Sequence, residues 1–515
     1  MEKKSLPIGI QEFKDFKEFN YLYIDKTEYI HRIVTSGQYY FLSRPRRFGK
    51  SLLLSTMKEL FKGSKELFEG LWIADNWDWT KTNPVLHISF AGSGHQEIGL
   101  NDALGELLDF QAGEKNIVLT AKSNATRFKE LLEKIHAQHG KVVVLIDEYD
   151  KPIIDNIDNV AEAGKNRDIL RDFYIVLKDN PQYLRFVFIT GVSKFSKVSI
   201  FSALNHLDDI STNDAYSTLV GYTQKELEFY FKDFIPVAAK KNEMSRKMLL
   251  TELKNWYDGY SWDAKNFVYN PFSVLKFFSQ NKFDNFWFVT GTPTFLSVLA
   301  RQQKFYDFEE LETEQSAFDT FDVENLNTQA AMFQTGYLTI KKYDRKRQRY
   351  TLSYPNQEVR KSFLAFLLEA YSFVQVNNVS PWAIKLEKAL FNKDIPTVID
   401  LVNTMFADIP SHIFDGKSEK YYHSLMHLIL QYLGTNIESE VNTNKGRIDT
   451  ILKTPQYIYI LEFKFDKSAD EALADIHTRG YGQKYAHLGK SIIGIGINFS
   501  SIVKGIDDWK EEVLG

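Results

Sequence analysis

The sequence predicts an α/β protein with two separate chemical sites. A β-rich run, Tyr39–Leu42, leads through a basic loop into Gly49-Lys50-Ser51 and an apolar helical segment. A second apolar run, Val142–Ile146, ends in Asp147-Glu148. Two further β-rich runs between residues 446 and 465 carry acidic and basic side chains. Because alternating strands and helices are typical of an open sheet, we expect a doubly wound parallel sheet at the N-terminus and a smaller α/β domain at the C-terminus.

The first of these elements, FLSRPRRFGKSLLLSTM at 41–57, has the order strand, loop, Gly-Lys-Ser, helix. A phosphate-binding P-loop has this order, and its backbone N–H groups face the phosphates at a helix N-terminus. Lys50 is expected to reach the β- and γ-phosphates of ATP, and Ser51 to ligate Mg²⁺. The usual pattern has glycine at the position of Arg44, and a bare Gly-Lys-Ser can also be an ordinary helix start. The loop residues predicted to contact the nucleotide are Arg46, Arg47, Phe48, Gly49, Lys50, Ser51 and Leu52.

The second element, KVVVLIDEYD at 141–150, contains five consecutive apolar residues. Such a run suits a central strand of a parallel sheet that is buried on both faces. In P-loop ATPases an apolar strand ending in Asp-Glu completes the site, so Asp147 is expected to hold Mg²⁺ and Glu148 to polarise the attacking water. Acids after a strand also act as helix caps, but both halves of an ATPase site occur here in the expected order.

A third β-rich run, YLRFVFIT at 183–190, leads into Gly191-Val192-Ser193. If this run lies beside the Asp-Glu strand, a polar residue at its end can sense the γ-phosphate. Thr190 and Ser193 are the candidates, and a plain strand-to-loop turn is the alternative. The run PVLHISF at 84–90 predicts one more core strand.

The middle of the chain is predicted to be mainly helical. Thr223 is a plausible helix cap with Glu226 three residues later, and helices should dominate 222–310 and 357–435. Two β-rich runs, GYLTIKKY and RYTLSYP, flank the turn DRKRQ and predict a hairpin within 330–355. This hairpin could be a DNA-contacting wing of a winged-helix domain, and a purely structural hairpin is the alternative.

The C-terminal runs GRIDTILK and YIYILEFKF place Asp449, Glu462 and Lys464 in the pattern D-x12-E-x-K. Two carboxylates can hold Mg²⁺ beside a scissile phosphate, and a lysine can orient the attacking water. Side chains alternate along a strand, so Glu462 and Lys464 share a face. With an even loop such as Thr454-Pro455, Asp449 pairs with Ile460 and lies diagonally from Glu462 on that face. The alternative is an amphipathic hairpin with its charges in water.

Composition excludes several classes of site. The 515 residues are 44% apolar and include no cysteine, which excludes disulfides, zinc ribbons, iron–sulfur clusters and cysteine nucleophiles and suits a reducing cytoplasm. No window of about 20 residues is apolar and free of charge, so no membrane span is predicted. The net charge is −4, with local basic stretches such as Lys341–Arg349. Residues 411–515 have 12 Lys and Arg against 14 Asp and Glu, so phosphate contacts would have to come from elsewhere.

Several of these motifs carry a family resemblance. RPRRFGKS, VLIDEYDKPI and FVFITGVSKFS, with the later WYDGY, YNPFS and WFVTGTPTF, resemble the bacterial AAA-ATPase-like family, whose members commonly have a C-terminal PD-(D/E)XK nuclease superfamily domain. In that family RPRRFGKS is the usual form of the loop, so Arg44 is no obstacle. The resemblance places the segment from Ile8 to Thr27 near the nucleotide base, and it suggests Glu440 as a further metal ligand or supporting acid. It also gives His423 a phosphate contact, although a capped helix-start histidine is the alternative.

One position departs from the family pattern. The helix after the nuclease-like core tends to read Ala-Leu-x-Gln-Ile, and here it reads Ala472-Leu473-Ala474-Asp475-Ile476. Asp475 adds negative charge near a phosphate site, which is expected to weaken cleavage or to alter metal binding.

These observations predict four parts: a P-loop AAA-like ATPase core at 1–220, a helical lid at 221–310, a helical, winged-helix-like middle with a β-hairpin at 311–404, and an α/β PD-(D/E)XK-like domain at 405–515. The predicted function is ATP binding and hydrolysis that gates Mg²⁺-dependent cleavage of nucleic acid. A nucleotide-switched sensor or scaffold, which binds nucleic acid or protein and has an inactive nuclease-like domain, is the alternative. The expected cofactors are ATP and Mg²⁺. We expect a cytoplasmic protein with nucleic acid as partner and no membrane association, and a homo-oligomer is compatible with the sequence.

Overall fold

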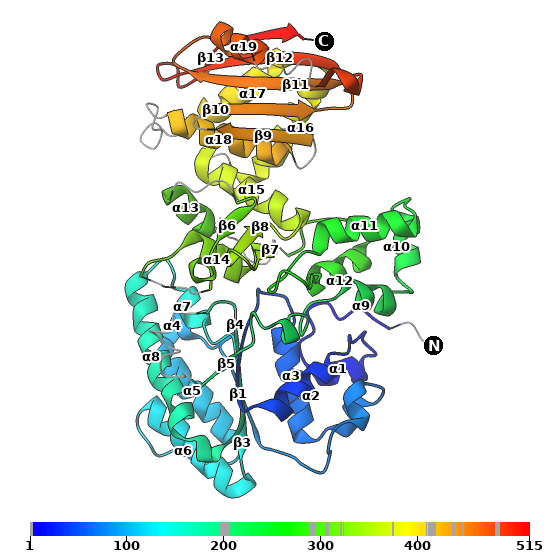
Figure 1. Ribbon diagram of the computed structural model, residues 1–515. Helices are drawn as coiled ribbons and strands as arrows, with labels where there is room; N and C mark the ends of the chain where they lie inside the picture. The colour runs from blue at the N-terminus through cyan, green and yellow to red at the C-terminus, as the bar shows by residue number, and fades with distance from the viewer. Residues whose placement is uncertain are drawn as a thin grey trace. The chain divides into compact units, whose positions relative to one another are not determined.

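The computed structural model describes residues 4–194, 206–287, 294–303, 308–319, 322, 324–372, 375–407, 409, 419–434, 438–444, 447–478 and 485–514 (Figure 1). The chain forms two compact units, which are described separately below. Unit 1 comprises 1–291 and 308–358, and unit 2 comprises 292–307 and 359–515. The four-part division predicted from the sequence is finer than these units and stays a prediction. None of the helices in the described ranges is long and apolar enough to cross a membrane.

Unit 1 contains a parallel five-stranded sheet with strand order β2-β3-β4-β1-β5. The apolar runs form its centre, and all six residues of β3 are buried, as expected for a strand covered on both faces. Strand β4 lies between β1 and β3, so the P-loop strand and the Asp-Glu strand are not direct neighbours. The strands are β1 (Tyr39–Ser43), β2 (Val85–Ser89), β3 (Val142–Asp147), β4 (Leu184–Gly191) and β5 (Asp208–Asp209).

Helices cover both faces of this sheet, which confirms the predicted doubly wound class. Figure 1 shows α1 to α3 on one side and α5, α6 and α8 on the other. The helices are α1 (Phe13–Glu18), α2 (Thr27–Ser36), α3 (Lys50–Lys62), α4 (His95–Ile98), α5 (Leu100–Gly113), α6 (Asn124–His139), α7 (Lys151–Ile154) and α8 (Val160–Asp179).

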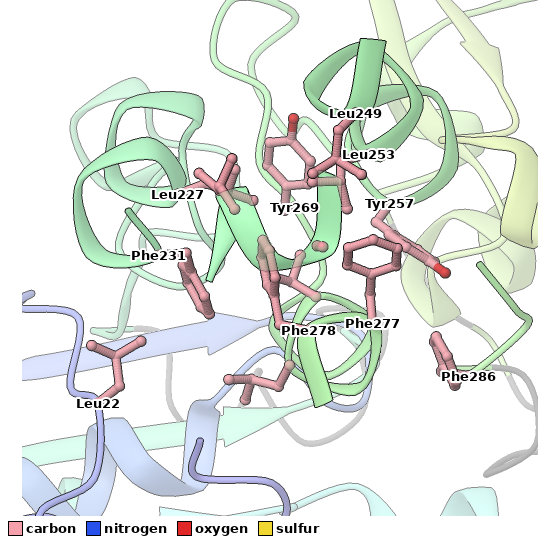
Figure 2. Packing of buried hydrophobic residues seen from close by; sticks show 14 of the residues in the cluster. Leu22, Leu227, Phe231, Leu249, Leu253, Tyr257, Tyr269, Phe277, Phe278 and Phe286 are labelled. Atoms are coloured by element: carbon pink, nitrogen blue, oxygen red, sulfur yellow. The ribbon is translucent and has the colours of Figure 1, made fainter. Parts of the chain in front are cut away.

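A helical subdomain follows the sheet in the chain. Its first helix begins with the predicted capping box, in which Thr223 Oγ1 accepts a hydrogen bond from the Glu226 backbone and the Glu226 carboxylate accepts one from the Thr223 backbone. Figure 2 shows the aromatic and aliphatic core, in which Phe231 stacks on Phe278 with ring centroids 4.8 Å apart. The helices are α9 (Gln224–Tyr230), α10 (Ile235–Lys241), α11 (Arg246–Tyr257) and α12 (Pro271–Gln280).

Unit 1 ends in a small antiparallel sheet of order β6-β8-β7, in which β6 precedes helix α14 (Thr328–Thr335) and β7 and β8 follow it. The predicted hairpin is β7 (Thr339–Asp344) and β8 (Arg349–Ser353). The third strand, β6 (Leu311–Thr313), was not predicted, because three residues are too few for a visible alternating pattern.

Unit 2 contains helices around a five-stranded mixed sheet of order β13-β12-β11-β10-β9. Strands β11 and β12 run parallel, and the other neighbouring pairs are antiparallel. A β-carbon at Gly496 would lie 2.4 Å from the Ala469 carbonyl oxygen, so this glycine lets helix α19 lie directly on β12. The elements are α13 (Thr294–Gln302), α15 (Gln357–Ser372), α16 (Val376–Phe391), α17 (Ile395–Ala407), α18 (Glu419–Leu433), β9 (Glu438–Asn444), β10 (Arg447–Lys453), β11 (Tyr457–Phe465), α19 (Ala469–Thr478), β12 (Ser491–Ser500) and β13 (Gly505–Val513).

Candidate functional sites

Unit 1 holds a cavity of about 380 Å³ at the N-terminus of helix α3. Four parts of the chain line it: the N-terminal segment, the P-loop, the segment that follows β3, and the edge of the helical subdomain. The volume is in the range of small-molecule and cofactor pockets. Every predicted P-loop contact residue lines it, namely Arg46, Arg47, Phe48, Gly49, Lys50, Ser51 and Leu52.

Lys50 is buried at the first turn of α3, and its ammonium group is bonded to the loop itself. Its Nζ donates hydrogen bonds to the carbonyl oxygens of Arg44, at 2.9 Å, and Pro45, at 3.0 Å. Burial lowers the pKa of Lys50, and the nearby carboxylates of Asp147 and Glu148 act in the opposite direction. Both acceptors are neutral, so a phosphate can replace them without separating a lysine–carboxylate ion pair.

Arg44 explains how the loop can lack its first glycine. Its guanidinium points away from the cavity and stacks over the Trp262 ring, 3.9 Å from the centroid. Its Nη1 donates to the carbonyl oxygens of Ser43, at 2.8 Å, and Ser211, at 2.6 Å. Complete burial lowers the pKa of Arg44 to about 9. Position 44 therefore contributes a backbone carbonyl to the loop, while its side chain anchors the loop from behind.

The loop also depends on two left-handed backbone positions. Gly49, the N-cap of α3, has φ 91°, a conformation in which a β-carbon is unfavourable. Arg47 adopts φ 69° although it is not glycine, and its guanidinium lies over the Phe272 ring at 4.9 Å. Phe272 also lines the cavity. Sequence reasoning assigned Phe272 no role, because only the fold brings the YNPFS segment to the P-loop.

The two acidic residues at the end of β3, Asp147 and Glu148, lie in different surroundings. Glu148 lines the cavity, has φ 52°, and has a raised pKa because of burial and the adjacent Asp147 carboxylate. Asp147 is buried behind it and accepts hydrogen bonds from Thr190 Oγ1 at 2.7 Å and from the Glu148 backbone at 3.1 Å. Asp147 and Glu148 therefore lie at the carboxyl edge of the sheet near Lys50.

Thr190 and Ser193 do not line the cavity. Thr190 Oγ1 donates to Asp147, so it lies behind the predicted metal ligand. Ser193 is fully buried, and its Oγ donates to Asp150 Oδ2 at 2.6 Å. Asp150 also accepts from the Ser193 backbone, and burial raises its pKa. The predicted nucleotide contacts of these two residues are not tested by this geometry, which gives both residues hydrogen bonds to acidic side chains.

Two distant segments meet at the edge of the cavity through a partly buried ion pair. Lys26 lines the cavity with Gly9, Ile10 and Tyr23. Its Nζ lies 2.6 Å from Glu226 Oε1, while the other oxygen of that carboxylate caps helix α9. Burial lowers the pKa of Lys26 despite this partner. Sequence reasoning missed the ion pair, because nothing in the local pattern relates residues 200 positions apart.

The second candidate site lies on the sheet of unit 2. Glu462 and Lys464 are two residues apart on β11, and both side chains are buried. Lys464 Nζ donates to Glu462 Oε1 at 2.9 Å and to Asp475 Oδ2 at 2.6 Å. Burial alone lowers the pKa of Lys464, but the bonds to Asp475 and Glu462 outweigh it and the pKa is raised. The departure from the family pattern at Asp475 is therefore in direct contact with the predicted catalytic lysine.

The backbone register places Asp449 directly opposite Glu462 on neighbouring antiparallel strands. The predicted example register had Asp449 opposite Ile460, which was wrong by two residues. Thr454 and Tyr457 close the turn through a backbone hydrogen bond of 2.8 Å, and four residues separate the first pair, Lys453 and Ile458. An even count keeps positions 449 and 462 on one face of the sheet, as the prediction required. The side chains of Asp449, Glu440 and His423, together with all of Gly446, lie outside the described part of the structure.

The donor atoms at both sites fit Mg²⁺, which prefers carboxylate and hydroxyl oxygens. In unit 1 these are Ser51 at the cavity and Asp147 behind it. In unit 2 they are the buried Glu462 carboxylate and position 449 opposite it. Among the described side chains, no group of three or more His, Asp or Glu residues could hold a metal ion.

Comparisons with known proteins identify the two regions of the chain that carry the candidate sites. A family model described as "Predicted AAA-ATPase" matches residues 7–201, and the "PD-(D/E)XK nuclease superfamily" model matches residues 417–509. A relative from Azotobacter chroococcum mcd 1, described as "Uncharacterized protein in vnfD 5'region", is 39% identical over 528 residues that cover all of both chains. The chain therefore belongs to the AAA-ATPase-like family and carries a C-terminal domain of the PD-(D/E)XK nuclease superfamily.

Proposed function

We propose that unit 1 binds and hydrolyses ATP in the P-loop cavity, and that its nucleotide state controls cleavage of nucleic acid by the site at Asp449, Glu462 and Lys464. The observation that carries the proposal is the cavity itself, in which a buried lysine with neutral acceptors and an acidic residue line the same space. Cytoplasmic action suits a chain without cysteine.

In the proposed ATPase site each residue has one task. Lys50 exchanges the carbonyls of Arg44 and Pro45 for phosphate oxygens, and the backbone of Gly49 to Leu52 faces the phosphates at the start of α3. Ser51 and Asp147 would hold Mg²⁺. Glu148 acts as the base that orients and deprotonates water, which suits its raised pKa and its place at the cavity. The N-terminal segment and Phe272 supply an apolar surface for the adenine ring of the nucleotide.

In the proposed nuclease site Glu462 and Asp449 would hold Mg²⁺, and Lys464 orients the attacking water. Bound Mg²⁺ would supply charge neutralisation at the phosphates of both sites. Lys464 must exchange at least one of its two carboxylate partners in order to reach a substrate.

A hydrogen-bonded path within unit 1 leads from the P-loop to the start of helix α15, and we propose that nucleotide state acts along it. The Trp287 indole donates to the Arg46 carbonyl in the P-loop at 3.1 Å, and the Trp287 backbone donates to Glu358 Oε1 at 2.8 Å. Glu358 is fully buried, accepts a second bond from Ser273, and is the second residue of α15, whose later residues belong to unit 2. A shift of the P-loop on nucleotide binding would thus act on the first turn of α15.

Two variants test the two chemical assignments. Lys50→Ala is expected to weaken ATP binding about 100-fold, because it removes the charged partner of the phosphates; unchanged affinity would show that the P-loop assignment is wrong.

Asp449→Ala is expected to abolish Mg²⁺-dependent cleavage of labelled DNA and RNA. Cleavage that persists in this variant would exclude the proposed nuclease site.

The path from the P-loop to α15 is tested by a substitution of Trp287. Trp287→Phe removes the indole N–H and keeps an aromatic ring, so we expect ATP affinity to persist while cleavage loses its dependence on ATP. Trp79→Phe is the matched control, since that indole donates to the Ala74 carbonyl at 2.9 Å, away from the P-loop. Equal nucleotide dependence in the two variants would contradict the path.

The ion pairs of Lys464 favour one second candidate function. A lysine already neutralised by Glu462 and Asp475 suits a nucleotide-switched scaffold whose nuclease-like domain binds without cutting. Titration with Mn²⁺ separates the two functions. A working nuclease site binds the ion and loses it in Asp449→Ala, whereas a scaffold shows no difference between wild type and variant.

A further inference from the structure

The turn of the β7–β8 hairpin in unit 1 is strongly basic in a chain whose net charge is −4. Five basic residues at this end of the hairpin are exposed, and together they are called the basic tip. They are Lys342, Arg345, Lys346, Arg347 and Arg349. The net-acidic 411–515 region has no comparable surplus of basic residues.

The acidic groups near the basic tip leave three of its cations without an ion pair. Asp344 Oδ1 accepts the backbone N–H groups of Lys346, at 2.9 Å, and Arg347, at 3.1 Å, so this carboxylate is used to hold the turn. Arg349 lies 3.5 Å from Glu312, and Arg347 lies 3.9 Å from Asp344. Of the carboxylates that the structure describes, none lies within ion-pair distance of Lys342, Arg345 or Lys346.

The hairpin that carries these cations is held together by packed aromatic rings. Tyr343 and Tyr350 are paired across the two strands and stack with ring centroids 4.4 Å apart. Phe318 contacts the other side of Tyr350, at 5.2 Å between centroids. Such cross-strand aromatic pairs stabilise a hairpin, so little order has to be gained when a ligand binds.

We propose that the basic tip is a docking surface for the phosphodiester backbone of nucleic acid. Exposed lysine and arginine side chains on a preformed loop neutralise phosphates and release counterions, which gives affinity with little sequence preference. The choice of nucleic acid as the polyanion rests on the proposed nuclease function. The basic tip would supply phosphate contacts, for which the acidic C-terminal region has no surplus of basic residues.

The test is binding of a labelled 30-nucleotide duplex and single strand, measured by fluorescence anisotropy in EDTA without nucleotide at several KCl concentrations. The variant Lys342→Ala/Arg345→Ala/Lys346→Ala should bind at least about tenfold more weakly, and its slope of log affinity against log salt should be smaller by about 2 to 3. Lys240→Ala/Lys241→Ala/Lys247→Ala removes the same charge from exposed positions on α10 and α11, and should bind like wild type. Equal melting temperatures of wild type and the two variants, followed by circular dichroism, would report that all three proteins are folded.

Equal affinity and slope in the hairpin variant and its control would overturn the proposal. So would binding of wild type to phosphatidylserine vesicles but not to nucleic acid, or to neither. Because the assay contains no metal and measures no cleavage, it does not depend on an active nuclease or ATPase. Cleavage that requires Asp449 but is unaffected by the hairpin variant would keep the proposed function and overturn only this docking surface.

Discussion

Two buried lysines define the two candidate sites, and they differ in what they touch. Lys50 in unit 1 donates to two backbone carbonyls, and burial lowers its pKa. Lys464 in unit 2 lies between two carboxylates, and these bonds raise its pKa despite burial. The first lysine can accept an anion by replacing neutral groups, whereas the second must first give up an ion pair.

The difference shows that a lysine at the right position in a motif is not by itself an available cation. Exchange of a carbonyl for a phosphate at Lys50 gains a charge-assisted bond. Exchange at Lys464 replaces one anion by another, so the gain depends on what then neutralises Glu462 and Asp475. Anion binding at Lys50 would therefore break bonds to neutral groups only, whereas anion binding at Lys464 would break an ion pair.

The largest expected effect concerns the carboxylate that lies near Lys50 without bonding to it. Glu148→Gln is expected to lower the ATPase kcat by about 10²- to 10⁴-fold, because it removes the proposed base and keeps the shape of the side chain. ATP affinity should remain close to that of wild type, as measured by isothermal titration. Glu162→Gln, on the exposed first turn of α8, is the control. A kcat equal to that of the control would remove Glu148 from the mechanism.

The pH dependence of the same step follows from the direction of the Glu148 pKa shift. Burial and Asp147 raise this pKa above its ordinary 4.5, and a base works only when deprotonated. The ATPase rate should therefore fall as the pH is lowered, with an acid limb centred above 4.5. A limb at or below 4.5 in the kcat profile would exclude Glu148 as the titrating group.

The comparison of the two lysines predicts unequal losses of stability. Lys464→Ala removes the cation facing the buried Glu462 carboxylate and should lower the free energy of unfolding of unit 2 by about 3–5 kcal/mol. Lys50→Ala removes a donor from two carbonyls only and should cost at most about 2 kcal/mol in unit 1. Urea unfolding of both variants measures the difference. Equal losses would mean that the carboxylate contacts of Lys464 add no more to the free energy of unfolding than the carbonyl contacts of Lys50.

Glu358 extends the comparison to a buried carboxyl whose hydrogen-bond partners include the neutral donors of Trp287 and Ser273. Burial raises its pKa to about 8. The folded state therefore binds a proton that the unfolded state has lost between pH 4.5 and about 8, so stability falls as the pH rises through this window, by about 1.4 kcal/mol per unit. Glu358→Gln should remove this dependence in melting temperatures recorded at pH 6 and 8. A variant with the wild-type slope would refute the assignment.

The smallest expected effect is at Asp475. Asp475→Asn keeps the size of the side chain and removes one of the two charges on Lys464, so cleavage under Mg²⁺ should rise about tenfold, the equivalent of roughly 1.5 kcal/mol. Asp470→Asn is the control, because that carboxylate lies on the same helix, α19, but pairs with Lys510 on β13 and not with Lys464. No cleavage in either variant would favour the scaffold function.

Local patterns were enough to predict the parts of both sites that depend on neighbours in the chain. The strands β1, β3 and β4, the capping box at Thr223 and the shared face of Glu462 and Lys464 follow from apolar runs and from period-two alternation. The register of Asp449 depends on the geometry of one turn, which a sequence pattern leaves open. Ser211, which accepts from Arg44, and Glu226, which pairs with Lys26, are more than 160 positions away in the chain, so only the fold could identify these contacts.

The way in which the cavity is enclosed has a consequence for synthesis of the protein. Its lining begins at Pro7 and ends at Leu275, and the P-loop strand β1 pairs with β4, near residue 187. During translation the N-terminal segment must therefore wait for most of unit 1 before its contacts can form, and such long-range pairing is slow and leaves apolar strands exposed. A ribosome-bound chain that has not yet exposed Leu275 cannot have a complete nucleotide site. Nucleotide binding by stalled chains of increasing length would show at which length the cavity of unit 1 is first complete.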